Sequence, residues 1–347
     1  MADTLVIHDG AGGAGGAERT VVEAANALDA DLYLGYCNIP REWFDKRVDN
    51  TVTVAGVGDK LPSVRDVLVA LHFATTTFPE YDTIVTSGPP AKFCQPHDRQ
   101  EHYHYLHHPA LGDVLWYEGA LTSYVAGALD RFEARGVPHL IANSKLTARR
   151  THAQYNRTVD AIINPPVDVE RFKHTDNHVR GRFVMIGRLV ERKRPDVAIE
   201  AFARLDGDAK LVVLGDGPML DNLQQIAPEN VELRGYVDDE EAARILGESG
   251  GAVTLPRTED FGITAVEYLA AGTPVVAVDE PNTNNIVSDD TGVLVEPRPA
   301  AVEAGVLSVM NEDWDRDSIA ATAEQYSSER FHEEVQKLVS GSTCEWG

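Results

Sequence analysis

The sequence predicts two α/β domains, each built on a parallel sheet covered by helices. Short runs of β-branched residues alternate along the chain with segments whose apolar residues recur at helical spacing, which is the pattern of such a sheet. A chain of 347 residues is also long for one domain. The strand pattern pauses near residues 165–180, where a Pro pair and a polar stretch are typical of a connector, and then restarts.

Three parts of the chain follow from this pattern. We expect residues 1–168 and residues 169–324 to form two doubly wound, Rossmann-like domains that face each other across a cleft. Residues 325–347 have no strand of their own. We expect them to form a helix and tail that pack back on the N-terminal domain.

Each predicted strand is a short apolar run. In the first domain these are TLVIH (4–8), LYLGYC (32–37), TVTVAGV (51–57), DTIVTS (82–87), HYHYLHH (102–108), HLIANS (139–144) and AIINPP (161–166). In the second they are RFVMIGR (182–188), KLVVLG (210–215), VELRGY (231–236), GAVTLP (251–256), TPVVAVD (273–279) and GVLVEP (292–297). Ligands of doubly wound sheets bind beyond the carboxyl ends of the strands, so residues that follow a strand are candidates for function.

The composition excludes several classes of protein. The formal net charge is −24, from 55 acidic and 31 basic residues, and such a field repels nucleic acid. Only eight of the basic residues are Lys, and this acidic, Arg-rich surface suggests a salt-loving source, in which the Debye length is about 3 Å. The chain lacks a membrane-spanning run and a signal peptide, so we expect a cytoplasmic protein.

A glycine-rich loop follows the first strand. Gly10, Gly12 and Gly15 have the G-x-G-x-x-G spacing of a dinucleotide site. That site also needs an acidic residue at the end of the second strand, where this chain has Cys37 and Asn38, so we do not expect a dinucleotide. The glycines would still let a phosphate or a sugar hydroxyl approach bare amides at a helix N-terminus.

Basic residues follow the first strand of the second domain. Arg188 comes directly after it and Lys193 five residues later, where both would suit a diphosphate. Arg192 and Arg194 are expected in a solvated turn before a helix that starts at Pro195. The Asp216-Gly217 pair is interpreted as turn chemistry.

Two carboxylates bracket a predicted helix start in EDFGITAVE (259–267). A helix from about Ile263 to Ala271 would leave the amides of residues 262–264 unpaired, and a phosphate fits there. Glu267, one turn into the helix, could bind a ribose, and Glu259 a sugar hydroxyl on the other side of the phosphate. Alternatively, Glu259 is a charge at a helix terminus and Glu267 a solvated helix residue.

Four histidines lie in HYHYLHHP (102–109). His102 and His104 alternate onto one face, but no acidic or Cys partner has ligand spacing, so no metal is expected. His107 or His108, at the carboxyl end of the strand, could donate a hydrogen bond to a substrate hydroxyl.

Taken together, these motifs resemble the retaining glycosyltransferases of family four, which have the two-domain fold called GT-B. The resemblance covers nearly the whole chain in order, through GGAER (15–19), YLHHP (105–109), IANS (141–144), NPPVD (164–168), IGRLVERKRPDVAIEAF (186–202), LGDGP (214–218), RGYVDDEEAARIL (234–246) and EDFGITAVEYLAAGTPVV (259–276). The sequences of these motifs are most similar to those of the O-antigen-type mannosyltransferases of bacteria and archaea. Together with the acidic composition, this similarity suggests a protein from a halophilic archaeon.

The resemblance implies a role for each matched residue. It assigns Arg188 and Lys193 to the donor diphosphate, Glu267 to the ribose and the backbone near Tyr236 to the nucleobase. Glu259 would contact the transferred sugar, His107 the donor sugar near the reacting carbon, and the backbone of Phe261, Gly262, Ile263 and Thr264 both sugar and phosphate. Gly15 and Gly16 would line the junction of donor and acceptor. His107, Glu259, Arg188 and Lys193 would take part in catalysis. The family needs no metal. One departure is EPNTNNIV (280–287), where Asn285 stands in the position of the family's usual Glu.

The resulting hypothesis is a metal-independent, retaining hexosyltransferase without a cofactor. It would move a hexose, with GDP-mannose as the best guess for the donor, to a hydroxyl of a glycan or lipid-linked glycan. The N-terminal domain would take the acceptor, and peripheral contact with the inner face of the membrane is compatible with such an acceptor. The alternatives are a nucleotide-sugar epimerase on the same fold and a non-catalytic sugar-nucleotide-binding partner of another transferase.

Overall fold

The computed structural model describes residues 3–13, 15–58, 64–109, 120–172, 178–205 and 209–341. The chain divides into two compact units: unit 1 contains Met1–Pro166 and Ser328–Gly347, and unit 2 contains Val167–Ser327. The first change of unit therefore follows the Pro165-Pro166 pair. The last six residues of the predicted tail, 342–347, lie outside the described residues.

Unit 1 has a seven-stranded sheet in the order β3-β2-β1-β4-β5-β6-β7, and every neighbouring pair is parallel. The strands are β1 (Thr4–His8), β2 (Asp31–Leu34), β3 (Val52–Val54), β4 (Thr83–Ser87), β5 (Glu101–Leu106), β6 (His139–Ala142) and β7 (Ala161–Ile162). The strand order reverses between β1 and β4, so the topological switch point of this sheet lies between the ends of these two strands.

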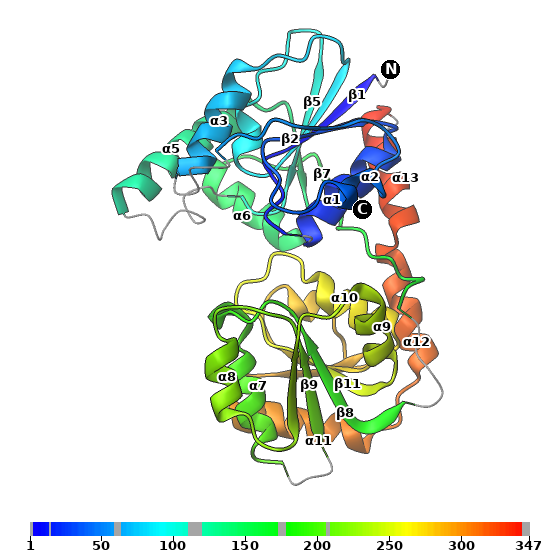
Figure 1. The fold of residues 1–347 in the computed structure, drawn as a ribbon. Helices are drawn as coiled ribbons and strands as arrows, with labels where there is room; N and C mark the ends of the chain where they lie inside the picture. Colours follow the sequence, from blue (N-terminus) through cyan, green and yellow to red (C-terminus); the bar gives the residue numbers. More distant parts are fainter. Residues whose placement is uncertain are drawn as a thin grey trace. The chain divides into compact units, whose positions relative to one another are not determined.

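Helices cover both faces of this sheet (Figure 1). They are α1 (Gly16–Ala27), α2 (Glu42–Asp45), α3 (Arg65–Thr75), η2 (Pro90–Phe93), α5 (Ala120–Gly136), α6 (Lys145–Tyr155) and α13 (Ser328–Val339). One apolar cluster joins the sheet to α1 and α13, and others join it to α3, η2, α5 and α6. Although α13 is the last described helix, it lies along α1, where His332 Nε2 is 2.7 Å from Glu23 Oε2.

Unit 2 has a six-stranded parallel sheet in the order β10-β9-β8-β11-β12-β13. The strands are β8 (Val179–Ile186), β9 (Lys210–Leu214), β10 (Val231–Gly235), β11 (Ser249–Thr254), β12 (Val275–Val278) and β13 (Gly292–Val295). The order reverses between β8 and β11, which places the second switch point there.

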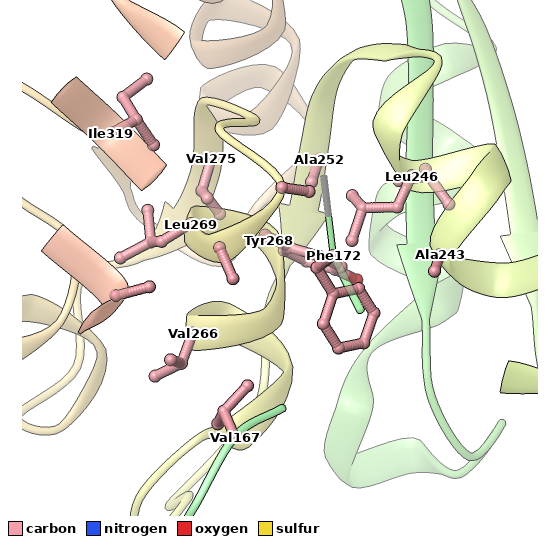
Figure 2. Packing of buried hydrophobic residues seen from close by; sticks show 14 of the residues in the cluster. Val167, Phe172, Ala243, Leu246, Ala252, Val266, Tyr268, Leu269, Val275 and Ile319 are labelled. Atoms are coloured by element: carbon pink, nitrogen blue, oxygen red, sulfur yellow. The ribbon is translucent and has the colours of Figure 1, made fainter. Parts of the chain in front are cut away.

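The helices of unit 2 form two layers. They are η4 (Glu191–Lys193), α7 (Pro195–Phe202), α8 (Leu220–Ile226), α9 (Asp239–Gly247), α10 (Ile263–Ala270), η5 (Thr283–Asn285), α11 (Pro299–Asn311), α12 (Arg316–Ala323) and η6 (Glu324–Tyr326). α9, α10 and α12 share one apolar cluster with the sheet, where Val266 and Leu269 of α10 pack near Ile319 of α12 (Figure 2). α7, α8 and α11 cover the other face.

The predicted class of two Rossmann-like α/β domains is confirmed, and all thirteen predicted strands are present. Most of them end earlier than the apolar runs suggest. β2 stops at Leu34 because Gly35 packs against the loop after β1: a Cβ at Gly35 would lie 2.4 Å from the backbone oxygen of Asp9. Residues counted as strand ends in the sequence therefore form loops at the carboxyl edge.

A buried ion pair lies between η2 and α5 of unit 1. The Lys92 ammonium contacts Asp130 Oδ1, and both side chains are fully buried. Tyr155 of α6 donates a hydrogen bond to Asp130 Oδ2 (2.6 Å) and accepts one from Lys92 Nζ (2.9 Å). Burial lowers the pKa of Lys92, whereas the Asp130 carboxylate raises it.

Replacing Lys92 with Met should destabilise the protein by about 3–5 kcal/mol, because it leaves the Asp130 carboxylate buried without its cation. The double variant Lys92→Met, Asp130→Leu should recover most of this loss. The measurement is the free energy of unfolding in urea at neutral pH. A single variant as stable as the wild type would contradict the importance of this pair.

Candidate functional site

The candidate site of unit 2 lies at the switch point of its sheet. Arg188 follows β8, and the loop of residues 255–262 follows β11, the neighbouring strand. Arg188 is exposed and forms no ion pair with any other residue that the structure describes. The resemblance assigned both segments to the donor, and the topology brings them to adjacent strand ends.

Lys193 and Glu259 form an ion pair at this edge. Lys193 Nζ lies 2.5 Å from Glu259 Oε2, and Arg192 Nη1 lies 3.6 Å from the same oxygen. Both side chains of the pair are about one-fifth exposed, at 21% and 20%. Glu259 Oε1 makes no hydrogen bond to another described residue. Among the described residues, the pair thus leaves one carboxylate oxygen without a hydrogen-bond partner, next to a cation.

Arg194 corrects the sequence interpretation, because it is not solvated. Its side chain is only 11% exposed and donates hydrogen bonds to the backbone oxygen of Leu255 (3.1 Å) and to Glu280 Oε1 (2.8 Å). Glu280 Oε2 in turn accepts the amide of Thr258 (2.9 Å). Arg194 therefore fixes the loop that carries Glu259. Arg192, which is 49% exposed, fits the predicted solvated turn better.

Helix α10 begins at Ile263 without a side-chain cap. Its N-cap, Gly262, has φ +95°, a left-handed conformation that disfavours residues with a Cβ. No backbone hydrogen bond among the described residues uses the amides of Ile263 or Thr264. These amides lie at the positive end of the helix and are suited to an anion. The predicted helix start is thus confirmed.

Glu267 and Tyr236 lie where the sequence predicted them, on the helix that begins at Ile263 and directly after the strand β10. Glu267 is partly buried, one turn into α10. Tyr236 follows β10 and is 78% exposed. Because all strands of the sheet are parallel, both residues belong to the same carboxyl edge as Arg188.

The LGDGP segment packs against the Arg188 loop. A Cβ at Gly215 would lie 2.0 Å from the oxygen of Gly187, and one at Gly217 would lie 2.4 Å from the oxygen of Leu189. The Leu189 amide donates to the backbone oxygen of Asp216 at 2.8 Å. These glycines allow the β8 and β9 loops to touch, which agrees with the interpretation of Asp216-Gly217 as turn chemistry.

The departing EPNTNNIV loop supports the helix start. Asn282 is buried and donates its side-chain amide to the backbone oxygen of Phe261. Asn285 donates to Pro281 O at 2.5 Å, within its own loop. Phe261 itself is buried and packs edge-on against Tyr326, with ring centroids 5.5 Å apart. The loop therefore holds the Phe261-Gly262 turn through Asn282.

In unit 1, His107 lies next to the switch point. Its Nε2 is hydrogen-bonded to Ser87 Oγ (2.9 Å), and the Nδ1–H of His8 donates to the backbone oxygen of Ser87 (3.1 Å). Burial lowers the pKa of His107 to about 3, so its ring is neutral at physiological pH. A neutral imidazole can exchange hydrogen bonds with hydroxyls. His108 is also partly buried and has an interaction partner.

The glycine-rich loop corrects a second expectation, since its amides are not bare. The Glu18 carboxylate folds back and accepts the amide of Gly15 (3.1 Å) and, at 3.5 Å, that of Gly13. Gly15 is the N-cap of α1 and Gly16 its first residue. Because a carboxylate already occupies the positive end of this helix, the loop disfavours a phosphate there.

His102 and His104 share a hydroxyl partner. Thr86 Oγ1 lies 2.9 Å from His102 Nε2 and 2.8 Å from His104 Nδ1, and all three side chains are buried. Burial lowers the pKa of His102 to about 4 and that of His104 well below its usual value. Within the described ranges, no group of three potential metal ligands is found.

Sequence reasoning missed Asp9, the residue directly after β1. Its Oδ1 accepts the amide of Gly10 (2.9 Å) and lies 3.4 Å from His8 Nδ1. Burial raises its pKa to about 7, and Asp66 adds to this increase. Its position directly after the first strand, next to the glycine-rich loop, could have identified it as a candidate from the sequence.

A family model described as "Glycosyl transferases group 1" matches residues 167–326, which nearly coincide with unit 2. The chain is also 32% identical over 133 residues to a GDP-mannose-dependent α-(1-6)-phosphatidylinositol dimannoside mannosyltransferase of Mycobacterium tuberculosis, covering 37% of this chain and 35% of the relative. It is 28% identical over 247 residues to a D-inositol 3-phosphate glycosyltransferase of Geodermatophilus obscurus, covering 59% and 52%. The chain thus spans from about a third to about half of these relatives.

Solved structures show the same fold over nearly the whole chain. HepE of Anabaena in complex with UDP-glucose has a TM-score of 0.77 at 17% identity, over 97% of this chain and 99% of that one. Sucrose-phosphate synthase of Thermosynechococcus elongatus has a TM-score of 0.73 at 15% identity, over 97% and 98%. The predicted GT-B fold is confirmed by these likenesses and by the two parallel sheets. No described helix is both long and apolar enough to cross a membrane.

Replacing Arg194 with Ala should destabilise unit 2 by about 1–3 kcal/mol, because it removes hydrogen bonds to Glu280 and Leu255 in a partly buried position. The matched control is Arg192→Ala, which removes a half-exposed cation from the same turn and should cost less than about 0.5 kcal/mol. Urea unfolding measures both. Equal losses in the two variants would contradict the anchoring role of Arg194.

Proposed function

We infer that the protein is a glycosyltransferase that uses a nucleotide diphosphate sugar as donor. The observation that carries this proposal is the Lys193–Glu259 pair beside the uncapped start of α10. Open helix amides and a lysine suit phosphate, and a carboxylate oxygen suits a sugar hydroxyl. The family model over residues 167–326 supports the same assignment.

Each part of a donor has a candidate partner in unit 2. The diphosphate is assigned to Arg188, Lys193 and the amides of Gly262, Ile263 and Thr264, and the transferred sugar to Glu259. Glu267 takes the ribose, and the nucleobase lies near Tyr236. Tyr236, exposed by 78%, offers an aromatic face for this purpose.

The cationic groups account for the chemical step. When the sugar departs, negative charge develops on the diphosphate, and Arg188, Lys193 and the helix start would stabilise it. We propose that the anomeric configuration is retained, with attack on the same face as the leaving group and proton transfer to the departing phosphate. His107, neutral and hydrogen-bonded to Ser87, is assigned to a donor-sugar hydroxyl. The proposed step uses no metal or cofactor.

The donor is proposed to be GDP-mannose, and the acceptor a glycan or lipid-linked glycan. The mycobacterial relative is described as GDP-mannose-dependent, which supports this donor. The structure of HepE, in contrast, was solved in complex with UDP-glucose. The net charge of −24 supports a salt-adapted enzyme from a halophilic archaeon. Assays with GDP- and UDP-sugars should therefore be run at molar and at low salt, and the anomer of the product identified by NMR. Release of free sugar or an epimer instead of a glycoside would favour the epimerase alternative.

Glu259→Gln and Lys193→Ala should each lower the rate of sugar transfer by about 100-fold or more, because each removes an interaction with the reacting groups. Nucleotide diphosphate binding, measured by calorimetry, should weaken in Lys193→Ala but change little in Glu259→Gln.

The control for this pair of variants is Arg204→Ala. Arg204 forms an exposed ion pair with Glu303 on α11 and should not affect transfer. Thermal melting of each variant separates loss of activity from loss of fold. Wild-type transfer rates in both site variants would refute the assignment.

A further inference from the structure

Asp9 occupies the switch point of unit 1, the one position of that sheet where a crevice for a ligand is expected. It follows β1 directly, while Gly88 follows β4, the strand on the other side of the switch point. The mechanism proposed above gives this residue no role. Its side chain is 22% exposed, so it remains accessible to a ligand.

Three glycines make room for this carboxylate and its surroundings. A Cβ at Gly88, where φ is +89°, would lie 2.4 Å from the Asp9 carboxylate. A Cβ at Gly35 would lie 2.4 Å from the Asp9 backbone oxygen, and one at Gly10 would lie 2.1 Å from the ring of Tyr36. The loops after β2 and β4 thus close on Asp9, and side chains at Gly35 or Gly88 would collide with it.

The carboxylate is held by one oxygen and open at the other. Oδ1 accepts the Gly10 amide at 2.9 Å, whereas Oδ2 has no hydrogen bond to a residue within the described ranges. Packing a carboxylate in this way costs stability, since burial disfavours the ionised form. The open oxygen is suited to a hydroxyl.

The surrounding charges decide between a neutral and an anionic ligand. Glu18 already takes the amides of the glycine-rich loop, and Asp66 lies near Asp9. The nearby cation Arg65 is stacked on the Tyr36 ring, with its guanidinium 3.8 Å from the ring centroid. A phosphate would meet two or three carboxylates here, whereas an uncharged polyol would find acceptors for its hydroxyls.

We propose that Asp9 binds a hydroxyl of the acceptor, and that the part of the acceptor at this position is an uncharged sugar or polyol rather than a phosphate-bearing group. The inference rests on the proposed function, because a transferase needs a second substrate. Apart from His107, the donor groups assigned above lie in unit 2, and Asp9 at the switch point of unit 1 is left for the acceptor.

The test compares Asp9→Asn with the wild type, using the donor that the wild type turns over. The acceptor probes are octyl α-mannoside, octyl β-glucoside and myo-inositol, each with a phosphorylated counterpart. The variant should raise KM for neutral acceptors about tenfold or more, because it weakens a hydrogen bond to a charged group. KM for the donor and nucleotide binding should stay within about twofold of wild type, because the groups assigned to the nucleotide and the diphosphate are in unit 2.

A stability measurement separates this role from a structural one. The raised pKa means that the folded state holds the Asp9 proton more tightly than the unfolded chain, so ionisation between about pH 4 and pH 7 costs stability. The titratable and charged groups near Asp9 are His8, Tyr36, Arg65 and Asp66. Since Asn cannot ionise, Asp9→Asn should melt at or above the wild-type temperature at pH 8. A structural carboxylate would give a lower Tm.

The matched control is Asp98→Asn, which removes an exposed carboxylate from the loop before β5 and should change neither KM. Unchanged acceptor KM in Asp9→Asn would overturn the inference. So would a wild type that binds donor but transfers only to the phosphorylated probes, or to none of them. Failure of the wild type to bind any nucleotide sugar would instead refute the proposed function.

Discussion

Parallel pairing of every strand is the constraint on which both candidate sites depend. Parallel strands all end at the same edge of their sheet, and each is followed by a loop and a helix that returns to the opposite edge. Polar residues far apart in the sequence are therefore collected at one edge without disturbing the apolar faces. Lys193 and Glu259 are 66 residues apart, yet they meet because β8 and β11 are neighbours.

The loops at these edges are compact because the backbone itself approaches closely. Gly215 and Gly217 in unit 2, and Gly35 and Gly88 in unit 1, lie where a Cβ would collide with another loop. Arg194 adds a further restraint in unit 2 by joining the loop before Glu259 to Glu280 after β12. Such restraints hold a site in place before the substrate arrives, which lowers the entropic cost of binding.

The sequence predicted the architecture well because strand periodicity and helix signals are local. The strands, the helix beginning at Ile263 and the turn at Asp216-Gly217 all follow from short segments. Side-chain contacts between segments that are distant in the sequence could not be predicted in this way. The ERKR segment did not reveal that Arg194 turns inward, because its partners are 61 to 86 residues away. Glu18 is only three residues from Gly15, at the N3 position of α1. The spacing of the glycines did not by itself reveal that this carboxylate accepts their amides.

The two edges have opposite electrostatic character, which limits what each can bind. In unit 2, Arg188, Lys193 and the amides at the start of α10 present positive charge beside the Glu259 carboxylate. In unit 1, Glu18 accepts the amides of Gly13 and Gly15, Arg65 is engaged with Tyr36, and His107 is uncharged. In a chain with a net charge of −24, Arg188, Lys193 and a helix N-terminus thus lie where a diphosphate would develop charge. An edge whose described cation, Arg65, is engaged with Tyr36 is better suited to neutral hydroxyl groups, because hydrogen bonds to a hydroxyl need no compensating positive charge.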